Sequence, residues 1–455
     1  MQLAMPQKHL GPRAFLACVL VINTTLILAI DMYVPALPGL LHEFDTTASF
    51  LNLTMFMFMF VSAFAILVSG PLSDKFGRKP VLVASCAIFA VSSFGCALST
   101  SVLMLTTFRI GQAVGFGLVE TDVTALIKDA YADKDLKFAM SLLQSLVIIG
   151  PVLAPFLGTL LLSIGGWREI FIALAVMGSV DLVFAFLITE TLQPSQRLAS
   201  GVIPALRDTL SRGRRLLSKR TFCAMALIVA LAGLPYMGYI AVASYILLDD
   251  FGASYLVYNL VYAGTCIVSV LAPFVYLRLS KVMRPKPLTL LCIVLGLAGA
   301  ALTWFFGPWG PLALFLVFAP YALMEGIIRP HAFVVLLDQP PEQVGSASAI
   351  VNFMYTVLGA IGTVVMTLPW ASYVGGLAII MGACSVLMLL LFCWGLRKSL
   401  RKRSLTKWLL RYHRPRVINP LHGESNEDSG HGRSGLHRKP HDHRAPKRRS
   451  RAHRI

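Results

Sequence analysis

Charged side chains lie inside long apolar stretches of the sequence, where they could carry protons or bind a charged molecule. Asp31 lies in the first stretch and Arg109 and Glu120 lie in the fourth. A carboxylate in hydrocarbon is costly unless it is paired, protonated or next to a water-filled cavity. Such a group can take up and release a proton as its access to water changes. We therefore expect Asp31 to handle protons or substrate; the alternative is an acid at the outer rim that only pairs structurally.

The positions of these charges along their stretches suggest which of them meet. Asp31 and Arg109 each lie about seven residues, or ~10 Å, from the same end of their stretches. We predict a contact between them that weakens when Asp31 is protonated, the alternative being a permanent salt bridge. Glu120 follows Arg109 by about three helical turns, so it shares a helix face and lies ~16 Å deeper. It should face a cavity if Arg109 does; otherwise it is a carboxylate near the cytoplasmic end that reaches water.

Further polar residues could line the same cavity. Glu325 precedes Arg329 by four residues in the tenth stretch, a spacing that allows a pair on one helix face. This pair could be self-neutralised, or Glu325 could act as a second carboxylate for a cationic substrate. The other expected cavity residues are Asn23, Tyr33 and Gln112.

The composition excludes most soluble proteins. Of the 455 residues, 56% are hydrophobic and 14% are charged, and the mean hydropathy is +0.71. Soluble proteins carry about 25% charged residues. The sequence therefore predicts an all-α membrane protein. The net charge of +18 is concentrated from residue 397 onward, where 18 of the 40 Lys and Arg but only 4 of the 22 Asp and Glu lie. A basic tail of this kind does not indicate a protein that binds nucleic acid.

Twelve apolar stretches are long enough to cross the hydrocarbon core as helices. Their approximate bounds are 14–36, 50–71, 79–100, 102–127, 138–162, 168–190, 222–247, 255–279, 287–306, 311–335, 344–369 and 374–396. The long polar connector 191–221 separates an N-terminal half, 1–190, from a C-terminal half, 222–396. A weak repeat of Leu-Ser and Lys-Pro pairs after the second and eighth stretches favours a transporter of two six-helix halves around a central cavity.

Basic residues occur in alternate connectors, which predicts the orientation. Lys and Arg concentrate in the connectors after the second, fourth, sixth and eighth stretches and in the tail. Both termini and the long connector should therefore be cytoplasmic, in the inner membrane of the cell. In the tail, residues 400–412 suggest an amphipathic helix, and 413–455 are expected to be disordered and to contact anionic lipids.

The connector from Gly70 to Pro80 packs an acid, three bases and two glycines into a short turn. Gly70 should let helices approach closely, and Gly77 should permit a turn that a Cβ would obstruct. Asp74 and Arg78 could pair with each other or with the end of another span, and so latch one conformation. The alternative is an ordinary charged loop. The string resembles the signature loop of the major facilitator superfamily, which implies that superfamily's twelve-helix fold.

Three more strings resemble motifs of that superfamily or of its drug exporters. Asp31-Met-Tyr33-Val-Pro-Ala-Leu-Pro38 looks like the first-span motif of the Bcr/CflA drug:proton antiporters, where the acid is associated with substrate or proton handling. Arg109 and Gln112 match the R-x-x-Q motif whose Arg is associated with proton transfer. The third string joins Gly150, Pro151, Pro155 and Gly158, and it resembles the drug-exporter antiporter motif with one glycine displaced; a structural kink is the alternative reading.

These resemblances imply proton-coupled efflux of small organic molecules, such as antibiotics or amino-acid-like compounds. The protein would be a monomer, would be driven by the proton gradient, and would need no cofactor or metal. The main alternative is a proton symporter that imports a nutrient. A membrane sensor or a membrane-embedded enzyme is a remote alternative, since no H-E-x-x-H string or ligand cluster is present in the sequence.

Overall fold

The computed structural model describes residues 7–198, 201–336 and 341–396, and these residues form helices and no strand. The helices of the first half are α1 (Pro12–Asp31), η1 (Val34–Ala36), α2 (Leu37–Glu43), α3 (Ala48–Leu51), α4 (Leu53–Phe76), α5 (Arg78–Ala97), α6 (Val102–Ala130), α7 (Asp133–Ile164) and α8 (Trp167–Leu187). The short η2 (Pro194–Gln196) and α9 (Val202–Leu217) follow in the connector.

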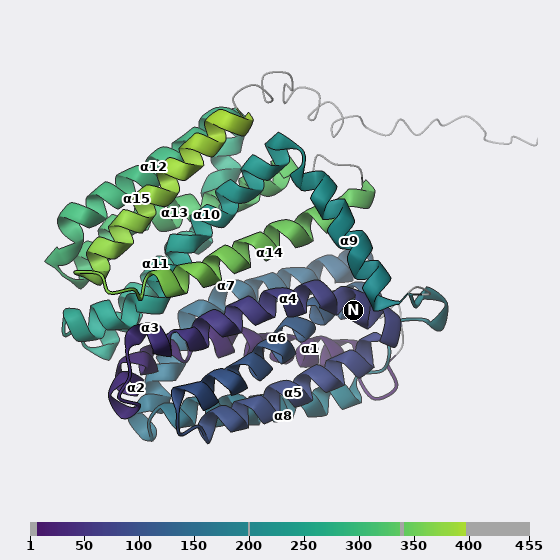
Figure 1. Ribbon diagram of the computed structural model, residues 1–455. Helices are drawn as coiled ribbons and strands as arrows, with labels where there is room; N and C mark the ends of the chain where they lie inside the picture. The colour runs from purple at the N-terminus through teal and green to yellow at the C-terminus, as the bar shows by residue number, and fades with distance from the viewer. Residues whose placement is uncertain (1–6, 199–200, 337–340, 397–455) are drawn as a thin grey trace, which may run out of the picture. The chain divides into compact units, whose positions relative to one another are not determined.

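The second half contains six long helices and three short ones (Figure 1). They are α10 (Arg220–Ser244), η3 (Tyr245–Asp250), α11 (Tyr255–Val282), α12 (Pro285–Phe306), η4 (Gly307–Trp309), α13 (Pro311–Leu336), α14 (Pro341–Val365), α15 (Tyr373–Leu391) and η5 (Phe392–Leu396). The expected tail helix and disordered segment lie outside the described residues.

The described residues contain eleven helices that are long and apolar enough to cross a membrane, and a twelfth span if the bent α7 is counted. This agrees with the twelve stretches found in the sequence. The two segments of α7, Asp135–Leu146 and Ile149–Ile164, meet at an angle of 40°. Pro151 follows directly, and a proline ring clashes with the carbonyl four residues before it, which bends a helix.

The first span is broken, which the sequence analysis did not predict. The stretch 14–36 was expected to form one helix, but α1 ends at Asp31, and η1 and α2 continue the span to Glu43. Pro35 accounts for the break, because a proline lacks the backbone N–H that would donate to the carbonyl four residues earlier, which here is that of Asp31. The break leaves carbonyl groups at the end of α1 without helical partners.

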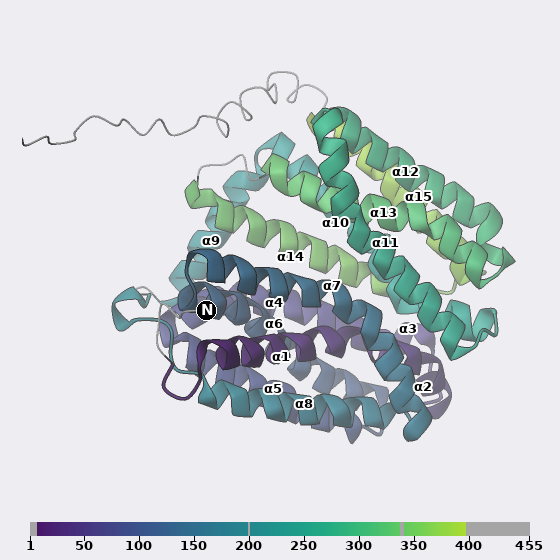
Figure 2. The same ribbon diagram turned by 180° about the vertical axis from the view of Figure 1, so that it is seen from behind.

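Each half is built from closely packed helix pairs (Figures 1 and 2). In the first half α6 packs between α4 and α5, and α5 also packs on α8. In the second half α13 packs between α11 and α12, and α12 also packs on α15. The halves meet where α4 contacts α14 and where α7 contacts α11. The corresponding helices α6 and α13 therefore occupy equivalent places in the two halves.

The connector between the halves is partly helical rather than only polar loop. Its helix α9 contacts α4 of the first half and α14 of the second. Gly213 and Leu216 form its buried face, and a Cβ on Gly213 would lie 1.8 Å from the side chain of Ile350. The connector is thus packed against both halves.

Candidate functional site

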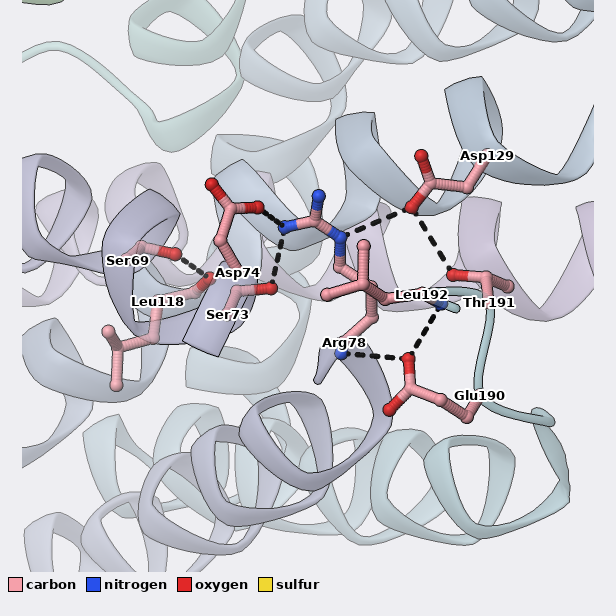
Figure 3. Close-up of polar contacts among 9 residues, drawn as sticks. All are labelled: Ser69, Ser73, Asp74, Arg78, Leu118, Asp129, Glu190, Thr191 and Leu192. Atoms are coloured by element: carbon pink, nitrogen blue, oxygen red, sulfur yellow. Dashed lines mark hydrogen bonds and ion pairs between the residues drawn. The ribbon is translucent and has the colours of Figure 1, made fainter. Parts of the chain in front are cut away.

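The connection between α4 and α5 forms a polar cluster around Arg78 (Figure 3). The guanidinium lies 2.8 Å from Asp74 and 3.2 Å from Asp129 at the end of α6, and it donates to Ser73 at 2.9 Å. The backbone N–H of Arg78 donates to Glu190 at 3.0 Å. Arg78 therefore ties α4, α5, α6 and the segment after α8 together. The expected Asp74–Arg78 pair is present, and the helix end that was expected to join it is that of α6.

The two glycines of this connection differ. Gly77 has φ of +104°, and a Cβ there would lie 2.2 Å from a carboxylate oxygen of Glu190. A side chain is therefore excluded both by the backbone and by space, as predicted. The expectation for Gly70 was wrong for this conformation, because no neighbouring atom of the described residues lies within 4 Å of a Cβ built on it. Within the described part of the chain, no other helix packs closely against Gly70.

Asp31 lies at the break of the first span and contacts the other half of the protein. Its side chain is buried, and Oδ1 accepts a hydrogen bond from the hydroxyl of Tyr262 on α11 at 3.0 Å. One turn earlier on α11, Asn259 donates to Thr159 of α7 at 2.8 Å. Two polar contacts on one face of α11 thus fasten it to the first half.

Arg109 is not paired with Asp31, which corrects the prediction. It is 1% exposed and donates from Nη1 to the carbonyl of Ala29 and to Gln112 Oε1, both at 3.1 Å. Among the described residues no ion pair joins it to an acid, and its Nε has no partner. Matching depths along two helices does not fix which way the side chains point. Because α1 ends at Asp31, the Ala29 carbonyl is free to accept this hydrogen bond, and the negative end of the α1 dipole favours the cation.

Aromatic rings enclose the same guanidinium. Its central carbon lies 4.2 Å from the ring centroid of Phe58 and 5.1 Å from that of Tyr33. Tyr33, which was expected to line a cavity, is buried, and its hydroxyl is 2.9 Å from Thr54 Oγ1. In this conformation Tyr33 therefore supports Arg109 rather than facing water.

Two other expected cavity residues are also buried. Gln112 donates to Ser93 at 2.7 Å while it accepts from Arg109, so it bridges α5 and α6. Asn23 is buried on α1, and its amide nitrogen has no partner among the described residues.

The glycines of α7 allow close contact with the first span. A Cβ on Gly158 would lie 2.2 Å from the carbonyl oxygen of Met32, directly after the break of α1. A Cβ on Gly150 would lie 2.2 Å from the side chain of Ile27. The close packing expected from the Gly150–Gly158 string is present, and its partner is the helix that carries Asp31.

A second group of polar side chains lies in the other half. Glu325 is 1% exposed and accepts hydrogen bonds from Tyr355 at 2.9 Å and from Ser269 at 3.1 Å. Arg329 is 3.8 Å from Glu325, so the expected pair is present, but at a distance longer than a hydrogen bond. The Arg329 side chain is 45% exposed, and Glu120 of the first half, also exposed, is close enough for the two charges to interact. Glu120 and Arg329 are thus two exposed charges of opposite sign, one from each half, that lie within electrostatic range of each other.

The described hydrogen bonds between the halves gather at one end of the bundle, which we call the α2 end because α2, α3 and η3 lie there. Asn52 donates to Tyr245 at 3.1 Å, and Ser49 donates to the carbonyl of Thr367. The contact of Asp31 with Tyr262 and that of Asn259 with Thr159 lie toward the same end. At the opposite end, which we call the α4–α5 end, the described contacts of Arg78 all lie within the first half and the segment that follows α8. The structure is thus fastened at the α2 end.

Several residues of these clusters were not found from the sequence. Tyr262 and Tyr355 look like ordinary aromatic residues of apolar stretches, and nothing local marks them. Asn259 was visible as a polar residue within the eighth stretch, and Asp129 and Glu190 as acids at the ends of the fourth and sixth. The polar residue types and the positions of these three could therefore have identified them from the sequence.

Comparison with known proteins identifies the fold. The family model of the Major Facilitator Superfamily matches residues 19–363. Multidrug resistance protein MdtL of Escherichia fergusonii is 26% identical over 383 residues, which cover 83% of this chain and 94% of the relative. The uncharacterized MFS-type transporter YdgK of Bacillus subtilis is 26% identical over 343 residues, covering 73% and 83%.

Solved structures agree on the architecture. A D-xylose-proton symporter has a TM-score of 0.65 at 18% identity and covers 86% of this chain and 99% of its own. A bacterial homolog of the human lysosomal transporter Spinster, in an inward-facing and unoccupied conformation, has a TM-score of 0.65 at 16% identity, covering 84% and 95%. The chain therefore belongs to the Major Facilitator Superfamily and is a multi-pass membrane transporter rather than an enzyme.

Proposed function

We propose that this transporter is a proton-coupled antiporter that exports small organic molecules, such as antibiotics or amino-acid-like compounds, across the inner membrane. The relative named as a multidrug resistance protein supports export of drugs. The observation that carries the proposal is the hydrogen bond from Tyr262 to Asp31, because it joins an ionisable group to the contact between the halves.

Asp31 would couple protons to alternating access through this hydrogen bond. A bond to an ionised carboxylate is roughly twice as strong as one between neutral groups. When Asp31 is charged, Tyr262 holds the α2 end closed. When Asp31 takes up a proton the bond weakens, and the α2 end can open. The proton thus shifts the balance between two conformations by a differential interaction with them.

Arg109 would keep the break of α1 in place while Asp31 changes its charge. Its bond to the Ala29 carbonyl lies two residues before Asp31 on the same helix. We propose that Arg109 acts by its position at the break of α1 and not by a direct pair with Asp31.

The cluster around Arg78 would act as a latch. In this conformation its contacts among the described residues lie within the first half, so it is available to contact the second half when the α4–α5 end closes. The distribution of Lys and Arg supports placing that end in the cytoplasm. The structure would then be open to the cytoplasm, and both termini and the α9 connector would be cytoplasmic. We also propose that the protein acts as a monomer.

Transport by everted membrane vesicles tests the function. With an acidic interior, the wild-type protein should drive uptake of at least one compound from a panel of antibiotics and amino acids. Asp31→Asn should abolish proton-driven uptake. Asp181→Asn is the matched control, since Asp181 is a buried acid on α8, a helix that packs on α1, α5 and α7 of the first half.

Two results would contradict the proposal. Proton-driven uptake that is unchanged in Asp31→Asn would remove that residue from the mechanism. Accumulation in right-side-out vesicles, driven by an inward proton gradient, would favour the symporter alternative.

A further inference from the structure

Glu120 and Arg329 present opposite charges to water from the two halves of the protein. Glu120 is exposed on α6, and the Arg329 side chain is 45% exposed on α13. Each lies 18 residues after the first residue of its helix, Val102 in α6 and Pro311 in α13. At 1.5 Å per residue both lie ~27 Å from the starts of these equivalent helices. The two charges are thus at the same depth in corresponding helices.

The two side chains interact without touching. Each contributes to the electrostatic environment of the other, but the described ion pairs include none between them. No guanidinium nitrogen of Arg329 therefore lies within 4.0 Å of a carboxylate oxygen of Glu120. The space between the charges is therefore wider than a direct contact.

Arg329 has donors to spare. Glu325, the only acid within ion-pair distance of it among the described residues, is 3.8 Å away and already accepts hydrogen bonds from Tyr355 and Ser269. A guanidinium has five N–H donors, and none of them makes a hydrogen bond within the described part of the chain. The central carbon of the guanidinium lies 4.4 Å from the centroid of the Tyr355 ring, which fixes its orientation. Arg329 is thus an oriented cation that faces water.

This arrangement favours a molecule that carries both charges. A simple cation would be attracted to Glu120 and repelled by Arg329, and a simple anion would meet the reverse. A molecule with an ammonium group and a carboxylate can satisfy both poles at once, and Arg is well suited to bind a carboxylate through two parallel hydrogen bonds. The Tyr355 ring offers an apolar surface beside the carboxylate position.

We propose that Glu120 and Arg329 form a two-pole binding site for a small zwitterion, with the ammonium at Glu120 and the carboxylate at Arg329. This inference rests on the proposed export function and specifies its substrate class. Because one pole belongs to each half, such a molecule bridges the halves when it binds. It would draw α6 and α13 together at the depth of the site, and so help to close the α4–α5 end.

Equilibrium binding to the purified full-length protein tests the site with three matched probes. L-phenylalanine carries both charges, 2-phenylethylamine lacks the carboxylate, and 3-phenylpropionate lacks the ammonium. The wild-type protein should bind L-phenylalanine at least tenfold more tightly than either of the others. In Glu120→Gln, L-phenylalanine should bind no more tightly than 3-phenylpropionate. In Arg329→Gln, L-phenylalanine should bind no more tightly than 2-phenylethylamine.

Controls separate a specific effect from damage to the fold. Glu43→Gln and Arg278→Gln make the same chemical changes elsewhere, at exposed positions at the end of α2 and near the end of α11, and they should leave the preference unchanged. Thermal unfolding checks that each variant is folded, and Glu120→Asp should keep part of the preference.

The proposal is overturned if the folded wild-type protein binds none of the three probes or binds one of the singly charged probes as tightly as L-phenylalanine. It is also overturned if both Gln variants keep the wild-type preference. Proton-driven drug uptake by the same protein is measured separately. If that uptake is present without a preference for the zwitterion, this site fails while the proposed export function stands.

Discussion

The hydrogen bond between Tyr262 and Asp31 makes a quantitative prediction about the balance of conformations. Tyr262→Phe removes one hydroxyl that donates to a buried carboxylate across the two halves. A hydrogen bond to a charged group contributes about 1.5–3 kcal/mol, and each 1.36 kcal/mol is a factor of ten in an equilibrium constant. The variant should therefore shift the ratio of the two conformations by about 10- to 150-fold toward opening of the α2 end.

Distances between spin labels measure this shift. One pair on Leu103 and Leu256 reports the α2 end, and a second pair on Phe76 and Val282 reports the α4–α5 end; all four side chains are exposed. In Tyr262→Phe the first distance should lengthen and the second should shorten in a larger fraction of molecules. The labelled background lacks Cys223 and Cys393, because the other six cysteines are buried.

Tyr258→Phe is the matched control. Tyr258 lies one turn earlier on the same helix and is equally buried, but its hydroxyl has no hydrogen-bond partner among the described residues. This change should leave both distance distributions as in the wild type. The reasoning is refuted if the two phenylalanine variants behave alike, or if Tyr262→Phe moves the balance toward closure of the α2 end.

Three further predictions concern packing, the latch and orientation. Gly158→Ala should cost about 1–3 kcal/mol of stability and abolish transport, because the added Cβ meets backbone at the break of α1. Gly70→Ala, where the Cβ meets no neighbour, should be tolerated. Equal melting temperatures and transport rates in the two variants would contradict this reasoning. Asp129→Ala removes an acceptor of the Arg78 cluster and should lower the free energy of unfolding by about 1–2 kcal/mol. Lys75→Gln, in the same connection, should leave the free energy of unfolding unchanged. Thermal unfolding compares the two variants, and an equal loss of stability in both would argue against the latch. A membrane-impermeant maleimide should label Lys75→Cys in everted vesicles and Leu103→Cys in right-side-out vesicles; the reverse pattern would overturn the proposed orientation.

The sequence predicts the fold well because the membrane restricts the structures that the chain can adopt. Only helices satisfy their backbone groups in hydrocarbon, so apolar length is enough to locate spans. A local pair is also predictable where both residues lie on one helix, because a spacing of four residues sets Glu325 beside Arg329 on α13. Asp74 lies in the last turn of α4 and Arg78 begins α5, so their pair follows from the tight turn at Gly77. Pro35 indicates the break of the first span, but a prediction of spans from apolar length alone does not take prolines into account.

The contacts of the buried charges could not be obtained in this way. Depth along a helix follows from residue counting, but the direction of a side chain depends on how the helices are rotated against each other. Arg109 therefore binds the Ala29 carbonyl and Gln112 rather than Asp31. Tyr262 contacts Asp31 from a residue more than two hundred positions away, and no periodicity within either helix predicts that contact.

The most direct test of the account is the response of the closed α2 end to pH in the absence of substrate. In the wild-type protein, acidification should increase the fraction of molecules with a long Leu103–Leu256 label distance, since protonation of Asp31 weakens its bond to Tyr262. In Asp31→Asn this fraction should be independent of pH, and in Asp181→Asn it should respond as in the wild type. A pH response of normal size in Asp31→Asn would contradict the central claim that this carboxylate couples protons to alternating access.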